Sequence, residues 1–433
     1  SHADSHADTY PNADPNTSSD PHADANANSD SHADTYPYPY PYPDTDTAAY
    51  THANADPDAN AAMTELDKYQ GIYANPERFP KYGHSNHGRG AARLLTKWQP
   101  ASVLDVGCGW NEFAGQMREE MPGARIVGVD FACPGADVIA PLTALPFADK
   151  EFDTITAFDV LEHLRPDEVD AALAEMARVS GRFIVSISYV PSVNKWQGQN
   201  LHPTVRPEEW WMLKLMQAGA AQLAKHGRYI VGSWRAKLPI QPADSVVLVG
   251  NGPSIVESKL GAAIDEHTHV VRFNNYQIAG FEQHTGERTT LWSTFFKRID
   301  QTARDVPVFC IHENDQVPER AQPVYRLPMV YYQRINAELH RRADWKHGFQ
   351  RDPERKLLAT SGLLVLAYLL EVVGVQRVTL AGFDHFDKSR TGMHHYWLKQ
   401  SFKRPPEHNG DLERQMFAEL RQAGRIEYLA PTF

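Results

Sequence analysis

Residues 103–113 read VLDVGCGWNEF, an apolar run that passes through two glycines into a helical pattern. The segment from Val103 to Val106 has the composition of a buried β-strand. Gly107 and Gly109 follow it directly, and glycines at such a point let the backbone turn sharply and approach a ligand. The order strand, glycine turn and helix is typical of nucleotide-binding α/β folds.

The alternation of strand and helix patterns extends well beyond this stretch. Between residues 101 and 190, helical patterns separate the apolar runs SVLDVG, RIVGVD, ADVIA, FDTITAFD and RFIVSIS. After RAKLPIQPAD, residues 235–244, the alternation begins again with SVVLVGNGPSI and continues with HVVRFN, TTLWST, VPVFCI and RVTLAGF. Such alternation predicts an α/β fold with two Rossmann-like, doubly wound domains in tandem, roughly at residues 63–238 and 245–433.

The N-terminal segment, residues 1–62, differs from the rest of the chain. It contains 11 Asp and no Lys, Arg or Glu, and its apolar residues are only Ala and Tyr. Such a composition buries too little apolar surface to offset chain entropy, so we expect a disordered, low-complexity tail. The remaining residues carry 43 basic and 54 − 11 = 43 acidic side chains. This neutral balance does not favour a nucleic-acid partner.

Cysteine usage and hydropathy indicate the cellular setting. Three cysteines, Cys108, Cys133 and Cys310, form no disulfide framework, which favours a reducing compartment. The longest apolar run, residues 362–375, is too short to span a bilayer and contains Glu371. We therefore expect a cytoplasmic protein without a transmembrane segment, and any association with membrane assembly machinery to be peripheral.

A second feature of the first half is the run VGVD, which ends a predicted strand at Asp130. A carboxylate at that strand end can accept hydrogen bonds from both ribose hydroxyls of a nucleoside. Together with LPFADKEFDTITAFDVLEHL, residues 145–164, these features resemble the class I S-adenosylmethionine-dependent methyltransferases over residues 63–220. The resemblance implies S-adenosylmethionine as cofactor. The binding residues it implies are Asp105, Gly107 and Gly109 for the methionine part, Asp130 for the ribose and Asp159 near the sulfonium.

Two positions depart from that family's pattern. Asn111 stands where the family often has a third glycine, and Pro141 where it often has an acid beside the adenine. A catalytically inert domain that serves as a scaffold is therefore an open alternative. The methyl acceptor is not indicated. His163 is more typical of packing or capping, whereas His202 or Glu208 could act as the base of an O-methyl transfer.

The second glycine turn, in SVVLVGNGPSI, places Asn251 between Gly250 and Gly252. Pro253 and Ser254 are predicted to open a helix whose free amides would favour a phosphate. The dinucleotide pattern GxGxxG is absent. Further segments follow in the order VVRFNNY (270–276), LLATSGLLVLAYLLEVVGVQRVTLAGFD (357–384), HHYW (394–397) and HNGDLE (408–413).

This ordered set resembles the sialyltransferases of glycosyltransferase family 29, and also the bacterial family 42, over residues 245–433. The matching segments are the large motif (246–275), the small motif (358–384), the HYW motif (395–397) and the His-x4-Glu motif (408–413). Vertebrate members join the large and small motifs by a disulfide, and neither motif here contains Cys. The resemblance implies a GT-A-variant fold, a CMP-activated 2-keto sugar acid as donor, a glycan acceptor and no required metal.

The resemblance also assigns site residues. The nucleotide is implied to be bound by Asn251, Gly252 and Asn274, and the cytidine or the sugar carboxylate by Ser361 and Gly362. The leaving phosphate is implied to be stabilised by His395 and Tyr396, with His394 as an adjacent alternative to these two. His408 is implied as the base that takes the proton of the acceptor hydroxyl. Its local alternative is an exposed residue ahead of a helix that Asn409 or Gly410 caps and that Glu413 stabilises through the dipole.

The sequence as a whole predicts a bifunctional, glycan-modifying enzyme. Its C-terminal domain would transfer sialic acid, another nonulosonate or Kdo from the CMP ester with inversion, without a metal. Its N-terminal domain would methylate a sugar hydroxyl, in the synthesis of a bacterial surface polysaccharide. Two alternatives are open: a glycosyltransferase with an inert methyltransferase scaffold, and a non-enzymatic nucleotide- or glycan-binding module. No residue is predicted to bind a metal.

Overall fold

The computed structural model describes the chain in seven ranges. They are residues 64–84, 88–295, 305–312, 323–343, 357–385, 395–396 and 408–429. The chain separates into two units, Ser1–Ala61 and Ala62–Phe433, and every described residue belongs to the second unit. The predicted disordered tail lies outside the described residues. Within these ranges, no helix combines the length and the apolar character that crossing a membrane requires.

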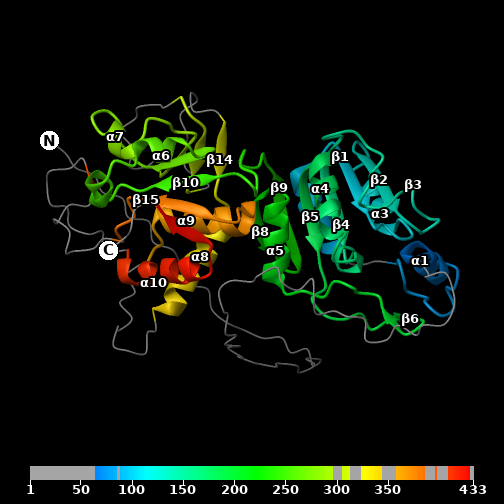
Figure 1. The fold of residues 1–433 in the computed structure, drawn as a ribbon. Coiled ribbons are helices and arrows are strands. Elements are labelled where there is room, and N and C mark those ends of the chain that lie inside the picture. The colour runs from blue at the N-terminus through cyan, green and yellow to red at the C-terminus, as the bar shows by residue number, and fades with distance from the viewer. Residues whose placement is uncertain are drawn as a thin grey trace, which may run out of the picture. The chain divides into compact units, whose positions relative to one another are not determined.

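The first sheet has seven strands in the order β3-β2-β1-β4-β5-β9-β8 (Figure 1). β3, β2, β1, β4 and β5 run parallel, whereas β9 joins β5 in antiparallel register and pairs with β8 as a hairpin. The parallel part confirms the expected fold, and the hairpin was not predicted. The strands are β1 Ser102–Val106, β2 Arg125–Asp130, β3 Val138–Ile139, β4 Phe152–Phe158, β5 Ser180–Ser186, β8 Ala220–His226 and β9 Tyr229–Trp234.

Helices connect these strands in the manner of βαβ units. The elements are α1 Glu65–Tyr73, α2 Arg89–Trp98, α3 Glu112–Glu120, the 3-10 turn η1 Leu161–His163, α4 Val169–Val179 and α5 Glu208–Gln217, and the two-residue strands β6 Lys195–Trp196 and β7 Gln199–Asn200. α1 begins with a capping box in which Thr64 and Asp67 exchange hydrogen bonds.

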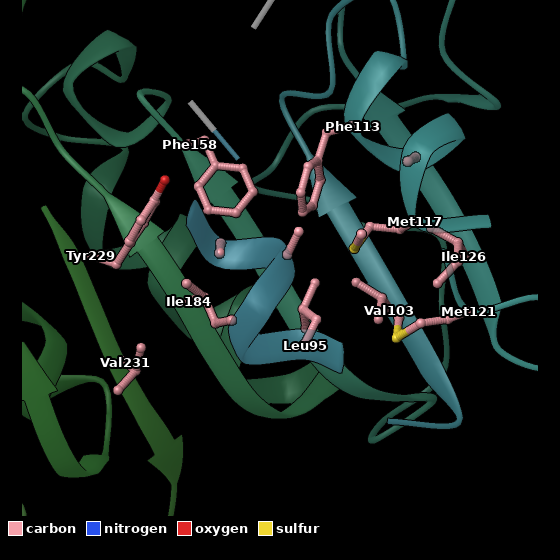
Figure 2. Packing of buried hydrophobic residues seen from close by; sticks show 13 residues of the cluster. Leu95, Val103, Phe113, Met117, Met121, Ile126, Phe158, Ile184, Tyr229 and Val231 are labelled. Carbon is pink, nitrogen blue, oxygen red and sulfur yellow. The ribbon is translucent and has the colours of Figure 1, made fainter. Parts of the chain in front are cut away.

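A close-packed apolar cluster joins α2 and α3 to the sheet (Figure 2). Leu95 of α2 is fully buried, and its apolar neighbours come from both helices and from strands β1, β2, β4, β5 and β9. The rings of Phe113 and Phe158 meet edge to face with centroids 4.9 Å apart, a favourable aromatic geometry. This packing fixes the turn after β1, because Phe113 lies on the helix that the turn opens.

The second sheet has seven strands, all parallel, in the order β14-β13-β12-β11-β10-β15-β16. The order reverses at β10, so the carboxyl ends of β10, β11 and β15 meet at the switch point where such sheets bind ligands. The strands are β10 Val246–Val249, β11 His269–Phe273, β12 Leu291–Thr294, β13 Val308–Cys310, β14 Val324–Arg326, β15 Val378–Ala381 and β16 Ile426–Tyr428.

One helical element of this second half differs from the predicted one. The helical elements are η2 Pro253–Glu257, α6 Gly261–Asp265, α7 Glu282–Thr285, α8 Met329–Arg342, α9 Ser361–Tyr368, η4 Leu369–Val373 and α10 Gly410–Gln422. The helix that begins at Ser361 changes to π geometry at Leu369 and ends at Gly374, whose φ is 82°. The helix expected at Pro253 is a five-residue 3-10 turn.

The boundaries predicted for the two domains stay a prediction. The first sheet ends at Trp234 and the second begins at Val246, with the proline-containing stretch between them.

Candidate active sites

The glycine turn after β1 has the backbone geometry that its sequence predicts. Gly107 and Gly109 have φ values of 65° and 55°, in the left-handed region that favours glycine. A Cβ at Gly109 would lie 2.3 Å from the carbonyl oxygen of Gly83, and a Cβ at Gly107 would strike Val160. The space above Gly109 is thus filled by the chain segment that follows α1.

Asp130 lies at the end of β2, beside that turn, and is only 5% exposed. Its Oδ1 accepts hydrogen bonds from the amides of Ala132 and Cys133, both at 2.9 Å. Its Oδ2 accepts from the Gly109 amide at 3.1 Å and from the Tyr73 hydroxyl at 3.3 Å. A ribose at Asp130 would therefore replace the longest of these bonds, the one from Tyr73.

Asp105, on β1, is a second buried carboxylate at the same edge. It is 3% exposed, and its Oδ1 accepts a 2.6 Å hydrogen bond from the Thr156 hydroxyl on β4. Burial raises the pKa of Asp105 to about 7, against the opposing effect of the Thr156 hydrogen bond. A carboxylate next to a glycine turn suits the ammonium group of an amino-acid ligand.

Asp159 follows β4 and has a φ of 55°. It accepts a 2.8 Å hydrogen bond from the Ser186 hydroxyl. It also forms an ion pair with Arg228 at 2.7 Å. The predicted cofactor residues Asp105, Asp130 and Asp159 thus lie at the carboxyl ends of neighbouring strands β1, β2 and β4. Their roles in cofactor binding stay predictions.

A cluster of possible metal ligands that was not predicted begins three residues after Asp159. Within the described part of the chain, Glu162, His163 and His202 each offer one ligand atom, and these atoms lie within 4.8 Å of one another. Burial raises the pKa of Glu162 to about 8 and, helped by His202, lowers that of His163 to about 3. Glu162 and His163 are adjacent in sequence, but His202 lies on a distant loop that no periodicity links to them.

In the second sheet, the turn after β10 is held by β15 rather than left open. The amide of Gly252 donates to the carbonyl of Gly382 at 2.9 Å, and the amide of Ser254 donates to Asp384 at 2.9 Å. The prediction of free amides at this turn is therefore wrong for Gly252 and Ser254. The physical reason is that the strand end of β15, with its own glycine and carboxylate, lies in van der Waals contact with the turn.

Asn251 is the polar side chain at this turn. Its Nδ2 donates to the carbonyl of Phe273, the last residue of β11, at 3.0 Å. Its Oδ1 is buried and has no hydrogen-bond partner within the described residues. Asn274 follows Phe273 with a φ of 50°, and its amide donates to the carbonyl of Ser293 at 2.9 Å. The two predicted nucleotide-binding asparagines thus stand at adjacent strand ends.

The HYW motif meets the large motif at this point. The amide of Tyr396 donates to the carbonyl of Asn251 at 3.1 Å. Tyr396 is 7% exposed, and its hydroxyl hydrogen bonds to the backbone of Gln277. In this arrangement Tyr396 anchors the segment, and His395 is the half-buried neighbour beside the turn. His394 lies outside the described residues.

The small motif meets the His-x4-Glu motif at the start of α9. Thr360 caps α9 by accepting from the Leu363 amide, and its amide and hydroxyl both donate to Glu413, at 2.8 and 2.7 Å. Glu413 is 3% exposed. Glu413 lies in the first turn of its own helix, as predicted, and its carboxylate also caps a second helix, α9, which was not predicted. Asn409 caps α10, as one of two predicted alternatives.

His408 is half-buried just ahead of α10. Its Nδ1 lies 2.9 Å from the carbonyl oxygen of Leu358, two residues before Thr360. A carbonyl only accepts, so Nδ1 carries the hydrogen and the neutral ring has its basic lone pair on Nε2. The interpretation of His408 as an exposed residue is wrong.

One aromatic side chain joins these two pairs of motifs. Phe383, after β15, is the nearest side chain to a Cβ placed at Gly362, at 2.6 Å, and it also lies against Gly250. Its ring is 5.8 Å from that of Phe417 on α10. Gly362 is therefore buried as a packing position, with Ser361 half-buried beside it. All four motifs thus contact a common set of strand ends and helix starts.

A depression of about 460 Å³ lies elsewhere, at the opposite edge of the first sheet. Its lining includes Phe152 and Arg182, near the amino ends of β4 and β5. It does not belong to either candidate site.

Comparison with known protein families finds two different families along the chain. Residues 104–185 match the family model described as a methyltransferase domain. Residues 232–302 match the model of glycosyltransferase family 29 (sialyltransferase). The chain therefore joins a methyltransferase-like part to a sialyltransferase-like glycosyltransferase part, and it is a transferase.

Individual proteins are similar to each part of the chain. A CMP-N-acetylneuraminate-beta-galactosamide-alpha-2,3-sialyltransferase 2 from Rattus norvegicus is 25% identical over 263 residues, covering 54% of this chain and 71% of that protein. Demethylmenaquinone methyltransferase from Thermus thermophilus is 32% identical over 115 residues, covering 22% of this chain and about half (51%) of that protein. A crystal structure of a mammalian sialyltransferase with Gal-beta-1-3GalNAc-ortho-nitrophenol aligns with a TM-score of 0.33 at 20% identity, covering 44% of this chain and 70% of that one.

Proposed function

We propose that the C-terminal part transfers a 2-keto sugar acid, sialic acid, a related nonulosonate or Kdo, from its CMP ester to a glycan acceptor. The observation that carries the proposal is the pairing of motifs: Tyr396 binds the backbone of Asn251, and Glu413 and His408 bind the segment that opens α9. Four segments far apart in sequence thereby surround the carboxyl ends of β10, β11 and β15.

His408 is the proposed base of this transfer. The hydrogen bond from its Nδ1 to Leu358 orients the ring and sets the tautomer in which Nε2 carries the basic lone pair, the atom that would take the proton of the acceptor hydroxyl. The acceptor oxygen then bonds to the anomeric carbon as the bond from that carbon to the phosphate oxygen breaks, which inverts the centre. The neutral imidazole of His395, beside the turn, would donate to the leaving phosphate and stabilise it without a metal.

We further propose that the N-terminal part binds S-adenosylmethionine and methylates a sugar hydroxyl. The residues present fit that molecule: Asp105 suits its ammonium, and Asp130 suits its vicinal ribose hydroxyls. When bound, it would supply an electrophilic methyl group. The chain's residues would bind and orient it, with the Tyr73 hydroxyl giving up Asp130 to the ribose.

A scaffold role for the N-terminal part is the second candidate. Its support is that the carboxylates already have partners within the chain, Tyr73 at Asp130 and Arg228 at Asp159. Calorimetry with S-adenosylmethionine distinguishes the two: measurable heat supports a functional site, and no heat at millimolar ligand supports the scaffold.

The cellular setting belongs to the same proposal: a cytoplasmic enzyme of bacterial surface polysaccharide synthesis, with any membrane association peripheral. Its support is the three cysteines, each buried as a free thiol.

A donor screen tests the transfer reaction. The full chain is incubated with CMP-Neu5Ac or CMP-Kdo, glycan acceptors and S-adenosylmethionine, and the products are analysed by mass spectrometry. A glycan that gains one sugar acid supports the proposal. CMP binding without CMP release, for every donor and acceptor supplied, would instead identify a binding module.

A further inference from the structure

Glu162 has a buried carboxylate oxygen that the fold does not satisfy. The residue is 0% exposed, and its Oε1 accepts a 2.8 Å hydrogen bond from the Ser188 amide. Its Oε2 is buried without a hydrogen-bond partner among the described residues. Leaving such an atom unpaired is unfavourable, so the position favours a cation or a donor other than those of the described residues.

Two imidazoles face the same space. The rings of His163 and His202 meet edge to face with centroids 4.7 Å apart. The ligand atoms of these two residues and of Glu162 all lie within 4.8 Å of one another. Metal–ligand bonds of about 2.0–2.2 Å place neighbouring ligand atoms roughly 3–3.5 Å apart. Small side-chain rotations would therefore complete a coordination shell.

Outer hydrogen bonds orient the His202 ring for this purpose. Its Nδ1 lies 2.7 Å from the carbonyl oxygen of Val190. Because a carbonyl only accepts, Nδ1 carries the hydrogen and Nε2 the lone pair.

A tyrosine contacts the His163 ring in the same way. The Tyr69 hydroxyl lies 3.2 Å from the carbonyl oxygen of Leu201 and 2.8 Å from Nδ1 of His163, and donation to that carbonyl makes the hydroxyl the acceptor for Nδ1. Metal-binding histidines typically donate their second ring N–H to a carbonyl or another polar partner in this way.

We propose that Glu162, His163 and His202 bind a divalent transition-metal ion of the Mn²⁺ or Zn²⁺ type at the carboxyl end of β4. Two imidazoles and one carboxylate suit such ions and leave coordination positions open for oxygen ligands. The charge of buried Lys68, which lies near His163, is offset by its ion pair with Glu65.

The proposed ion has a consequence that rests on the proposed methyl transfer. Asp159, assigned to the methyl-donor end of the site, is three residues before Glu162. An acceptor hydroxyl bound at an open position of the ion would lose its proton more readily, because a bound cation lowers the pKa of a coordinated oxygen. The metal would thus select a hydroxyl acceptor and activate it.

Mn²⁺ binding to the full chain tests the site. Mn²⁺ is the chosen probe because buried thiols compete for it less than for Zn²⁺. Chelator-treated protein is titrated with Mn²⁺, and free Mn²⁺ is followed by its paramagnetic resonance signal. Glu162→Gln and His202→Ala are compared with the unmodified chain and with His226→Ala, which changes an exposed histidine at the end of β8. The histidines and aspartates of residues 1–62 give the same background in all four proteins.

The unmodified chain and His226→Ala should show one site above that background, and both cluster variants should bind it at least about tenfold more weakly. Equal binding by all four proteins would overturn the proposal. If circular dichroism shows that Glu162→Gln does not fold, the Mn²⁺ affinity of the loop variant His202→Ala is the deciding measurement. Calorimetry with S-adenosylmethionine on metal-free protein separates the proposed metal site from the proposed methyl transfer. If the chain binds Mn²⁺ but not the cofactor, only the methyl-transfer function is refuted. If it binds the cofactor but not Mn²⁺, only the metal site is refuted.

Discussion

Removing the Glu413 carboxylate should release the first turn of α9. Glu413 accepts two hydrogen bonds from Thr360, one from its amide and one from its hydroxyl, and is almost fully buried. Hydrogen bonds to a charged group each contribute about 1.5–3 kcal/mol, and Glu413→Ala also leaves a helix-start amide without an acceptor. We expect a local destabilisation of about 3 kcal/mol. At 1.36 kcal/mol per factor of ten, this corresponds to an increase of roughly a hundredfold in local opening.

Native-state hydrogen exchange measures this opening directly. The informative amides are those of Leu363 and Leu364, which donate to Thr360. Glu413→Gln should lie between the parent and Glu413→Ala, since one side-chain oxygen is kept. The matched control is Glu419→Ala, on the same helix, which removes an exposed ion pair with Arg342 and should change exchange by less than about fivefold.

Activity provides the second readout of the same variants. Glu413 does not need to touch substrate, but the segment that it holds also carries Leu358, the partner of His408. We therefore expect kcat to fall in Glu413→Ala and to recover partly in Glu413→Gln, with CMP affinity little changed. Exchange at α9 that stays within threefold of the parent in Glu413→Ala would refute the capping role.

Three further predictions concern the two candidate sites. His408→Ala should abolish sugar transfer while CMP binding is retained, and near-normal turnover would remove His408 from the mechanism. Because burial raises the pKa of Asp105 to about 7, the ionised form that pairs with an ammonium is populated above that pH. The affinity for S-adenosylmethionine should therefore rise between pH 6 and about 8 by calorimetry, and this rise should be absent in Asp105→Asn. Gly109→Ala should destabilise the protein by about 1–3 kcal/mol in thermal melts, because of its positive φ and the 2.3 Å approach to Gly83. Gly115→Ala, in the open interior of α3, should be neutral or stabilising by up to about 1 kcal/mol.

The fold could be predicted where hydrophobic runs alone determine the structure. All of the strand segments named from the sequence overlap parallel strands of the two sheets, since a strand buried on both faces is apolar along its length. The β8–β9 hairpin was missed, because AAQLAKH has three polar positions and a register irregularity between Ala221 and Ala224. Its pairing is set by β5, which no local pattern reveals.

The sequence predicts where the residues of the candidate sites lie along strands and helices, but not which residues they contact. Asp130 was expected at a strand end, yet its partner Tyr73 comes from a helix 57 residues earlier. Glu413 was interpreted within its own helix, whereas its partner Thr360 is 53 residues away. In each case a buried carboxylate had to find donors, and the nearest donors in space are distant in sequence.

Both candidate sites lie at the carboxyl ends of parallel strands. They differ in how far their buried oxygens have hydrogen-bond donors within the chain. At Asp130 every oxygen has donors within the chain, and only the Tyr73 bond, the longest, can be exchanged for a ribose at small cost. Because a ligand's hydrogen bond there replaces an existing one, it adds less net free energy than a bond to an unsatisfied group. At Asn251, by contrast, a buried Oδ1 has no hydrogen-bond partner among the residues that the structure describes, and the same is true of Oε2 of Glu162. These two unsatisfied oxygens are where a bound group would gain most, so specificity for ligands should reside at these side chains rather than at the backbone amides of the glycine turns.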